Sequence, residues 1–198
     1  MNPLVPRDIE GGLVLASRSL RRSSILTGLG FAFDVHPAPE TIEDSTTSDD
    51  PYSVPEEFAR AKCRAVAPQF AGSLVLAADT VVIVDNEILT KPRDDDEAIR
   101  FLERLSGRAH TVVTGIALER VSRGVAVFGS ERTTVVFREL DRSMIERYIA
   151  TGEGRDKAGS YAAQGLGAAL VRRIEGCFYN VVGLPVSLLL DLMEDIDP

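Results

Sequence analysis

The residue best suited to chemistry is an aspartate inside an apolar segment. Asp79, followed by Thr80, interrupts residues 74–84, which are otherwise Leu, Val, Ile and Ala. Such a run predicts a buried strand. Burying an unpaired carboxylate costs roughly several kcal/mol, so Asp79 would need a cation, a metal or hydrogen bonds there. The alternative is a bend at residues 78–80 that leaves Asp79 in solvent, and this segment alone slightly favours the bend. Cations elsewhere in the chain shift the balance toward the buried site.

Three of those cations, Arg18, Arg21 and Arg22, follow a short apolar run at residues 13–16. Ser17 or Ser19 can cap a helix that begins among them. A strand that leads into a helix N-terminus presents free N–H groups and the positive end of the helix dipole, which together favour an anion. A solvated, arginine-rich helix face is an equally common outcome.

Two lysines are further candidates. Lys62 is spaced by four from both Phe58 and Val66, so it projects from the same helical face as two core residues. Such a lysine more often extends its stem to reach water, and the alternative is that it points into a polar site. Lys91 follows the central apolar segment.

The elements that would position these residues alternate between strand and helix. A loop at 38–54 carries acidic residues, and a glycine-rich loop occupies 156–167. Residues 1–11 are expected to be a flexible lead, and 12–198 a single domain. Strands are expected at 13–16, 33–37, 74–84, 109–121, 125–138 and 168–174, and helices after Ser17 or Ser19, from Pro55, after Asp94, after Asp141 and from about 185 to Met193.

The composition limits the function classes. The 198 residues are 44% hydrophobic and carry a net charge of −8, which argues against a nucleic-acid polymer or an anionic membrane as a general partner. Two cysteines and two histidines are too few for a disulfide scaffold or a His-rich metal site. No apolar run reaches the roughly 20 residues of a spanning helix. No signal-peptide pattern is present at the start, so we expect a cytoplasmic protein. The P-loop and dinucleotide-binding glycine motifs are both missing.

Five segments follow one another along the chain: LVLASRSLRRSSIL (13–26), FARAKCRA (58–65), VLAADTVVIVDNEILTKPRDDDEAIRFLERLSGRAHTVVTG (75–115), DKAGSYAAQG (156–165) and NVVGLP (180–185). Together they resemble the Maf family of nucleoside triphosphate pyrophosphatases, in family order across residues 13–185. The resemblance implies an α/β fold with three layers around a twisted mixed β-sheet, and two lobes with a cleft between them. It also implies metal-dependent hydrolysis of a nucleoside triphosphate to the monophosphate and pyrophosphate.

The resemblance assigns roles to individual residues. Asp79 is the catalytic residue and, with Glu43, a ligand of a divalent cation, Mg²⁺ or Mn²⁺. Glu40 or Asp44 could replace Glu43, because this loop is longer than is usual in the family. Whether Asp79 acts as the base or chiefly as a metal ligand stays open. The substrate-binding positions fall on Ser17, Arg21, Arg22, Lys62, Thr80, Lys91 and Gln164.

Three of these positions discriminate between substrates in the family. Arg21, Thr80 and Gln164 match the dTTP/UTP branch, whereas the 7-methyl-GTP branch typically has Trp, Gln and Glu there. The amide of Gln164 offers a donor and an acceptor that fit the O4/N3–H edge of uracil or thymine. The alternatives are a pyrophosphatase for other or modified nucleotides, such as 7-methyl-GTP or CTP, and a nucleotide-binding regulator of cell division with little turnover. A homodimer is one option for the assembly.

The chain departs from the family at a few positions. Leu20 replaces the usual proline and could loosen the start of the first helix, and Arg18 replaces a small residue. Ala77 replaces the family's usual glycine, and Ala162-Ala163 replace a more usual Gly-Ile pair. None of these changes removes a group with chemistry.

Overall fold

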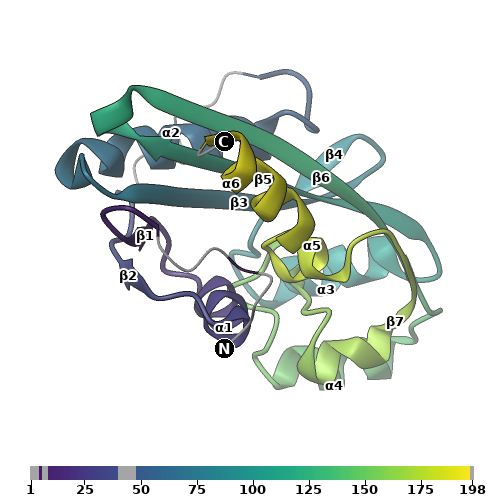
Figure 1. Ribbon diagram of the computed structural model, residues 1–198. Helices are drawn as coiled ribbons and strands as arrows, with labels where there is room; N and C mark the ends of the chain where they lie inside the picture. The colour runs from purple at the N-terminus through teal and green to yellow at the C-terminus, as the bar shows by residue number, and fades with distance from the viewer. Residues whose placement is uncertain (1–4, 6–8, 40–47, 197–198) are drawn as a thin grey trace. The chain divides into compact units, whose positions relative to one another are not determined.

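A seven-stranded mixed β-sheet flanked by helices makes this an α/β protein (Figure 1). The structure is a computed structural model that describes residues 5, 9–39 and 48–196. The strand order is β2-β1-β3-β5-β6-β7, with β4 paired to β3; β1 is parallel to β2 and β3, whereas β4 and β7 are antiparallel to their partners. The strands are β1 (Leu13–Leu15), β2 (Phe33–Val35), β3 (Leu74–Val84), β4 (Glu87–Leu89), β5 (Ala109–Arg120), β6 (Val125–Phe137) and β7 (Val171–Glu175).

The helices begin close to where the sequence places them, because their capping residues act as expected. Side chains of Ser19, Asp94 and Asp141 accept hydrogen bonds from backbone N–H groups three residues later. Helix α1 ends at Gly30, whose φ of 87° lies in the left-handed region that glycine favours. The helices are α1 (Leu20–Leu29), α2 (Val54–Val66), α3 (Asp95–Leu105), α4 (Arg142–Ala150), α5 (Phe178–Val182) and α6 (Val186–Ile196).

The chain forms two compact units, and β3, β5 and β6 contribute residues to both. Unit 1 contains residues 1–79, 114–131 and 183–198, and unit 2 contains residues 80–113 and 132–182. Whether the two units act as one domain over 12–198 stays a prediction.

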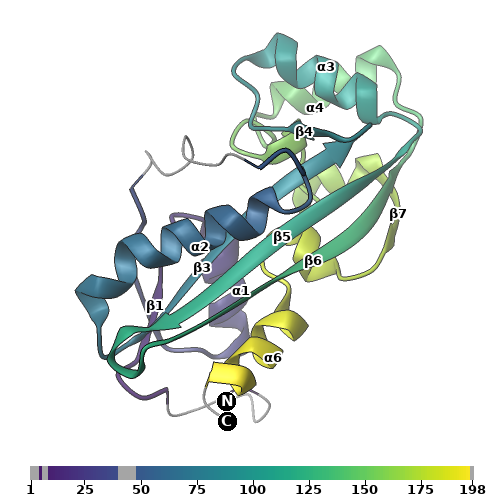
Figure 2. The same cartoon turned by 90° about the horizontal axis from the view of Figure 1, so that it is seen from above.

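In unit 1, helix α2 packs along one face of the sheet. Ala59, Cys63 and Val66 of this helix are buried against strand residues that include Val75 and Ala77. Helices α1 and α6 lie on the other side of the strands (Figure 2). Alternate residues of the same β3 segment are buried on both faces, which explains its continuous apolar sequence.

In unit 2, helices α3 and α4 pack against each other and share one apolar core with the strands of the unit. The buried ring of His110 packs edge-on against the rings of both Phe137 and Tyr161, which also contact each other. Asn180 of α5 is fully buried and donates hydrogen bonds from its amide to the Val112 carbonyl oxygen and to Thr133 Oγ1. The Asn-Val-Val-Gly segment therefore ties α5 to two strands.

The structure excludes one alternative that the sequence left open and corrects the start of one expected strand. Strand β3 runs without interruption from Leu74 to Val84, so there is no bend at residues 78–80. The strand expected at 168–174 begins only at Val171, because residues Gly165–Leu170 form a 3₁₀ helix.

The described residues of the N-terminal lead make definite contacts. Glu10 accepts hydrogen bonds from Arg120 and Arg123, and Val5 is buried. Flexibility of the lead as a whole stays a prediction, since residues 1–4 and 6–8 lie outside the described part. Among the described helices, none has both the length and the apolar composition needed to cross a membrane.

Candidate active site

Asp79 of β3 forms an ion pair with Lys62 of α2. The Lys62 Nζ lies 2.6 Å from Asp79 Oδ1, and the two side chains are only 13% and 15% exposed. The lysine therefore does not extend into bulk water, and the carboxylate is not a solvated turn residue. Lys62 and Asp79 are thus held mostly out of solvent, where two opposite charges attract each other more strongly than in water.

A glycine in β5 brings the N-terminal end of α2 close to the sheet. A Cβ at Gly115 would lie 2.4 Å from both the N and the Cα of Glu56, which is closer than real Cβ atoms approach any other atom. Only glycine allows this approach of helix to strand. Lys62 is less than two turns further along the same helix, so Gly115 helps to set its distance from Asp79.

The junction between β1 and α1 holds a second group of predicted residues. Ser17 is buried, and its Oγ accepts hydrogen bonds from the Ser19 N–H at 3.2 Å and from Arg22 Nη1 at 3.0 Å. The Nε of Arg22 also donates to the Gly183 carbonyl oxygen at 2.8 Å. Ser19 caps the helix even though Leu20 replaces the family's usual proline. The first turn of α1 contains two arginines and no acidic residue.

The sheet register places the Lys62–Asp79 pair and the start of α1 after the same, carboxyl end of the β1–β3 pairing. Leu15 pairs with Leu76 in parallel orientation, so the chain after β1 and the second half of β3 continue in the same direction. Ser17 and Asp79 follow these paired residues by two and three positions. Strand β2 is also parallel to β1 and ends at Val35, opposite Leu15. Ligands of α/β sheets bind at such carboxyl ends of parallel strands.

The predicted acidic metal ligands lie outside the described residues. Glu43 and its alternatives Glu40 and Asp44 belong to the segment after β2, of which residues 40–47 are not described. Their role stays a prediction.

Unit 2 contains the remaining predicted residues, Thr80, Lys91 and Gln164. Thr80 is partly buried, whereas Lys91 and Gln164 are exposed. The Thr90 carbonyl oxygen accepts a hydrogen bond from the Gly159 N–H at 3.1 Å. The segment that carries Lys91 is therefore joined directly to the glycine-rich loop that carries Gln164.

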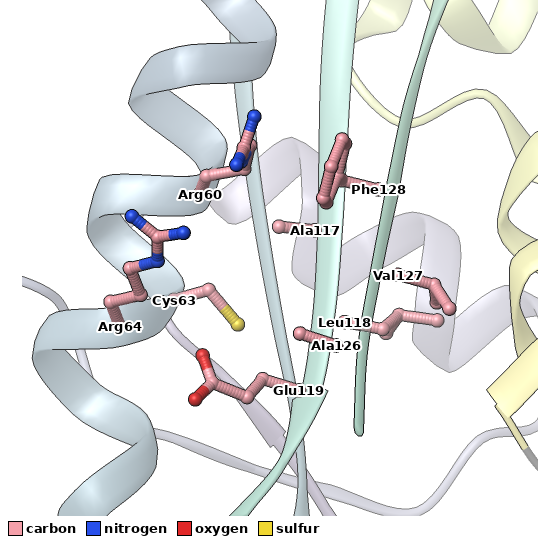
Figure 3. Close-up of a pocket in the computed structure, with 9 residues that line it drawn as sticks. All are labelled: Arg60, Cys63, Arg64, Ala117, Leu118, Glu119, Ala126, Val127 and Phe128. Atoms are coloured by element: carbon pink, nitrogen blue, oxygen red, sulfur yellow. The ribbon is translucent and has the colours of Figure 1, made fainter. Parts of the chain in front are cut away.

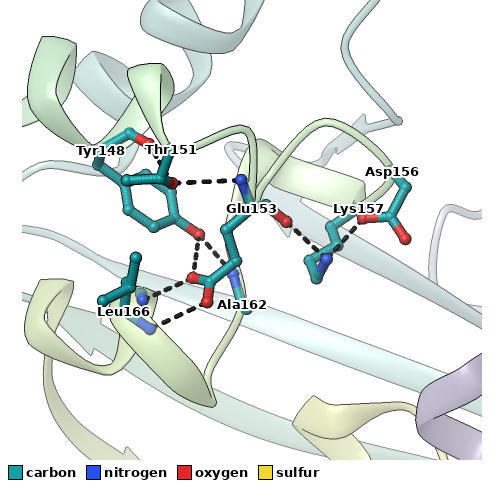
Figure 4. A network of polar contacts seen from close by, with 8 residues as sticks. Tyr148, Thr151, Glu153, Asp156, Lys157, Ala162 and Leu166 are labelled. Atoms are coloured by element: carbon teal, nitrogen blue, oxygen red, sulfur yellow. Dashed lines mark hydrogen bonds and ion pairs between the residues drawn. The ribbon is translucent and has the colours of Figure 1, made fainter.

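Sequence reasoning did not identify the residue that organises this loop. Glu153, in the turn after α4, accepts hydrogen bonds from the backbone N–H groups of Leu166 and Gly167 (Figure 4). A single glutamate after a helix carries no motif or periodicity, so no sequence signal was available to find it.

A pocket in unit 1 is separate from all the predicted site residues. Its lining includes Arg60, Cys63, Glu119 and Phe128 (Figure 3). Burial raises the pKa of the Cys63 thiol to about 12, with the charge of Glu119 adding to the effect, so the thiol is neutral near pH 7. The Arg60 guanidinium lies 3.8 Å from the centre of the Phe128 ring, a cation–π contact. This pocket therefore offers no thiolate nucleophile.

The described residues fit a magnesium or manganese ion only in part. They contain no group of three or more His, Cys, Asp and Glu side chains that could hold a metal alone. Mg²⁺, however, is commonly bound by one or two carboxylates together with phosphate oxygens and water. Asp79, at the strand edge next to the arginine-bearing helix, fits such a shared site.

These features define an α/β protein in which a Lys–Asp ion pair and an arginine-bearing helix N-terminus follow the carboxyl ends of paired parallel strands. The chain belongs to the Maf family, since the model of the Maf-like protein family matches residues 12–196. A dTTP/UTP pyrophosphatase of Symbiobacterium thermophilum is 45% identical over 181 residues, 91% of this chain and 92% of that protein. One of Pyrococcus furiosus is 44% identical over 182 residues, 92% and 94% of the two chains. One of Syntrophomonas wolfei is 42% identical over 179 residues, 90% and 94%.

A solved structure supports the fold. The Ham1 protein of Staphylococcus aureus superimposes with a TM-score of 0.53 at 16% identity, covering 92% of this chain and 98% of that one. At this identity the likeness concerns the fold alone.

Proposed function

We propose that this protein hydrolyses dTTP and UTP to the monophosphate and pyrophosphate. The observation that carries the proposal is the Lys62–Asp79 pair, which follows the paired residues Leu15 and Leu76 on β3 as the N-terminus of α1, with Arg21 and Arg22, follows them on β1. The curated relatives, similar over nearly their whole length, support the choice of dTTP and UTP.

The triphosphate would bind at the start of α1. Cations at a helix N-terminus are unfavourable toward the dipole by a few tenths of a kcal/mol, roughly, and a bound anion offsets this because it attracts both the cations and the positive end of the dipole. Two arginines with no acidic residue in this turn are therefore better suited to the bound than to the free protein. Ser17 and Gly183 hold the Arg22 guanidinium in a fixed orientation, as bidentate phosphate recognition requires.

Lys62 and Asp79 would act at the bond that breaks. Cleavage between the α- and β-phosphates needs a water placed in line and neutralisation of the charge that develops. The Asp79 carboxylate can accept a proton from that water or orient it, and the Lys62 ammonium can contact phosphate oxygens. Their ion pair keeps both groups in place before substrate arrives.

A divalent cation would be held by Asp79, with Glu43 as the proposed second ligand. When bound, it would supply charge neutralisation at the phosphate oxygens and acidify a coordinated water. Lys91 would contribute a further positive charge to the phosphates.

The base would be recognised by residues of unit 2, and Arg21 stays a predicted substrate-discriminating position. The amide of Gln164 can donate to O4 and accept from N3–H of uracil or thymine, and Thr80 offers a hydroxyl. Cytosine presents the reverse pattern at both atoms, so a fixed amide would discriminate against it.

The proposal is tested by measuring pyrophosphate release from the four standard ribonucleotides, the deoxynucleotides and 7-methyl-GTP, with and without Mg²⁺ or Mn²⁺. We expect dTTP and UTP to give the highest kcat/KM, with stoichiometric monophosphate and pyrophosphate. Release of orthophosphate and a diphosphate would contradict the proposed bond cleavage.

The same panel separates the alternatives. A preference for 7-methyl-GTP or CTP would redirect the substrate assignment but keep the reaction. Tight nucleotide binding without turnover would support a regulatory protein, although a binder has no need of the buried Lys62–Asp79 pair. Location in the cytoplasm and assembly as a homodimer stay predictions, and light scattering tests the assembly.

A further inference from the structure

The carboxylate of Glu153 connects α4 to the glycine-rich loop of unit 2. Its Oε1 accepts a hydrogen bond from the Leu166 N–H at 2.9 Å, and its Oε2 accepts one from the Gly167 N–H at 2.7 Å (Figure 4). Hydrogen bonds from backbone N–H groups to an ionised carboxylate are shorter and about twice as strong as neutral ones. The backbone is therefore fixed at Leu166 and Gly167, two and three residues after Gln164.

Tyr148 fixes the other side of Gln164. Its hydroxyl donates to Glu153 Oε2 at 3.0 Å and accepts from the Ala162 N–H at 3.1 Å (Figure 4). Burial raises the pKa of this phenol, so it remains a neutral donor. Gln164 thus lies between two anchored backbone positions that share one hydrogen-bond network.

Two glycines of the loop, Gly165 and Gly167, leave room for this hydrogen-bond network. A Cβ at Gly165, where φ is +64°, would lie 2.3 Å from Glu153 Oε1. A Cβ at Gly167 would lie 2.2 Å from the Ala162 carbonyl oxygen and 2.8 Å from the Tyr148 hydroxyl. The backbone can approach the two side chains this closely only because both residues are glycine.

Glu153 is itself held firmly. Its N–H donates to Thr151 Oγ1 at 3.2 Å, and its carbonyl oxygen accepts from Lys157 Nζ at 2.6 Å (Figure 4). Burial alone would raise the pKa of its carboxyl, but the two backbone N–H groups and Tyr148 hold this pKa below its usual range. The carboxylate is therefore a charged acceptor with fixed position at neutral pH.

Gln164 is exposed, so the position of its amide depends on the position of its backbone. A long amide can discriminate between two bases only if its backbone is placed to within about half an ångström. We propose that Glu153, together with Tyr148, is a positioning residue that fixes residues 162–167 so that Gln164 presents its amide to the base. This inference rests on the proposed function, in which Gln164 recognises uracil or thymine.

The test compares kcat/KM for dTTP with kcat/KM for dCTP in Glu153→Gln and Tyr148→Phe. The amide of Glu153→Gln would place an NH₂ group against one backbone N–H, and Tyr148→Phe removes the hydroxyl that joins the two anchors. We expect the dTTP/dCTP ratio to fall at least about fivefold in each variant, through loss of dTTP activity. The matched control is Glu146→Gln. Glu146 is an exposed glutamate of α4, the helix that carries Tyr148, and it pairs with Arg142. The dTTP/dCTP ratio of this variant should stay within about twofold of wild type.

A double-mutant cycle separates positioning from general destabilisation. In a Gln164→Ala background, Glu153→Gln should leave the ratio unchanged, because the side chain that it positions has been removed. A merely structural role would lower activity on both nucleotides equally in either background. Hydrogen exchange of the Leu166 and Gly167 amides should also be faster in Glu153→Gln than in Glu146→Gln.

The outcomes distinguish this inference from the proposed function. Wild type and Gln164→Ala alone decide whether dTTP is cleaved to pyrophosphate and whether Gln164 reads the base. If both behave as proposed but Glu153→Gln and Tyr148→Phe keep the wild-type ratio, the positioning role is overturned. If Glu153→Gln fails to fold, Tyr148→Phe decides, since it removes a single hydroxyl.

Discussion

The ammonium nitrogen of Lys62 lies 2.6 Å from Oδ1 of Asp79. The two residues are 17 positions apart in the sequence, and they belong to helix α2 and strand β3. Taking two such charges out of water costs several kcal/mol per ion, roughly, and their attraction often fails to recover the cost. Apolar residues could fill this part of the core at no penalty. A mostly buried pair at a strand edge is therefore better explained by chemistry than by stability.

Replacing the carboxylate of this pair tests its chemical role. Asp79→Asn keeps the shape of the side chain but removes the charge and the basicity that water activation or metal binding needs. We expect kcat/KM for dTTP to fall by about two orders of magnitude or more, as for loss of a general base. The unfolding free energy should also fall, by roughly 1–3 kcal/mol, because the Lys62 ammonium loses its carboxylate partner. A folded variant with a near wild-type rate would refute the catalytic assignment.

The lysine of the pair is tested by Lys62→Met, which keeps most of the apolar stem. Turnover should drop at least about tenfold, equivalent to roughly 1.4 kcal/mol of lost transition-state stabilisation. Arg64→Met on the same helix is the matched control: it removes the same charge from an exposed position outside the pair, and its steady-state rate should stay within twofold of wild type. Equal rates in the two variants would assign Lys62 no role beyond packing.

The sequence predicted the elements well, because their ends are marked by local chemistry. Ser19, Asp94 and Asp141 cap helices as expected, and Gly30 ends α1. The strand expected at 168–174 begins three residues later, at Val171. An Ala- and Gly-containing apolar run is compatible with either a strand or a short helix, and only the tertiary contacts of the preceding loop decide between them.

The candidate site was predictable only in part. Residues 74–84 alone slightly favoured a solvated bend at Asp79, and burial was favoured only once the cations elsewhere in the chain were considered. The partner of Asp79 could not be deduced, since periodicity places Lys62 on a core face without saying what lies opposite. The contact depends on a close approach at Gly115, which has no signature in a single sequence. Glu153 was missed for the same reason: its partners are backbone N–H groups, which every residue type except proline provides.

The phosphate-binding role of the α1 junction is tested by Arg22→Lys. Lysine keeps the charge but cannot reproduce the two N–H bonds that the guanidinium makes to Ser17 and Gly183. We expect kcat/KM for dTTP to fall about tenfold, roughly 1.4 kcal/mol, mainly through a higher KM. Arg18→Lys, at an exposed position before the helix, should change KM less than twofold. Comparable KM values for the two variants would argue against a bidentate phosphate contact.

The close approach of α2 to β5 predicts a specific effect of one methyl group. Gly115→Ala places a Cβ 2.4 Å from Glu56 backbone atoms, so the helix must shift. We expect a loss of about 1–3 kcal/mol in unfolding free energy by denaturant titration, together with lower activity because Lys62 moves with the helix. Gly28→Ala is the opposite case. That glycine is exposed within α1 with open space around its Cβ position, so alanine should stabilise by about 0.5–1 kcal/mol.

The last prediction concerns the pH dependence of stability. His110 is buried beside Tyr161, with its Nε2 2.8 Å from the tyrosine hydroxyl. Its Nδ1 has no hydrogen-bond partner among the described residues, so a second ring proton would add an unpaired buried donor. Burial lowers the pKa of His110 from 6.5 to about 4.

The folded protein therefore keeps His110 neutral at pH values where the unfolded chain binds a proton. The stability that depends on this neutral ring is fully present above about pH 6.5 and is lost as the pH falls toward about 4, to a limit of roughly 3 kcal/mol. His110→Gln cannot titrate but can still bond the Tyr161 hydroxyl. Other groups titrate in both proteins, so the difference in unfolding free energy between variant and wild type isolates this effect. Denaturant titrations at pH 7.5 and pH 4.5 should show that difference shifting in favour of the variant at the lower pH. A constant difference would mean that His110 is protonated in the folded protein or reaches solvent.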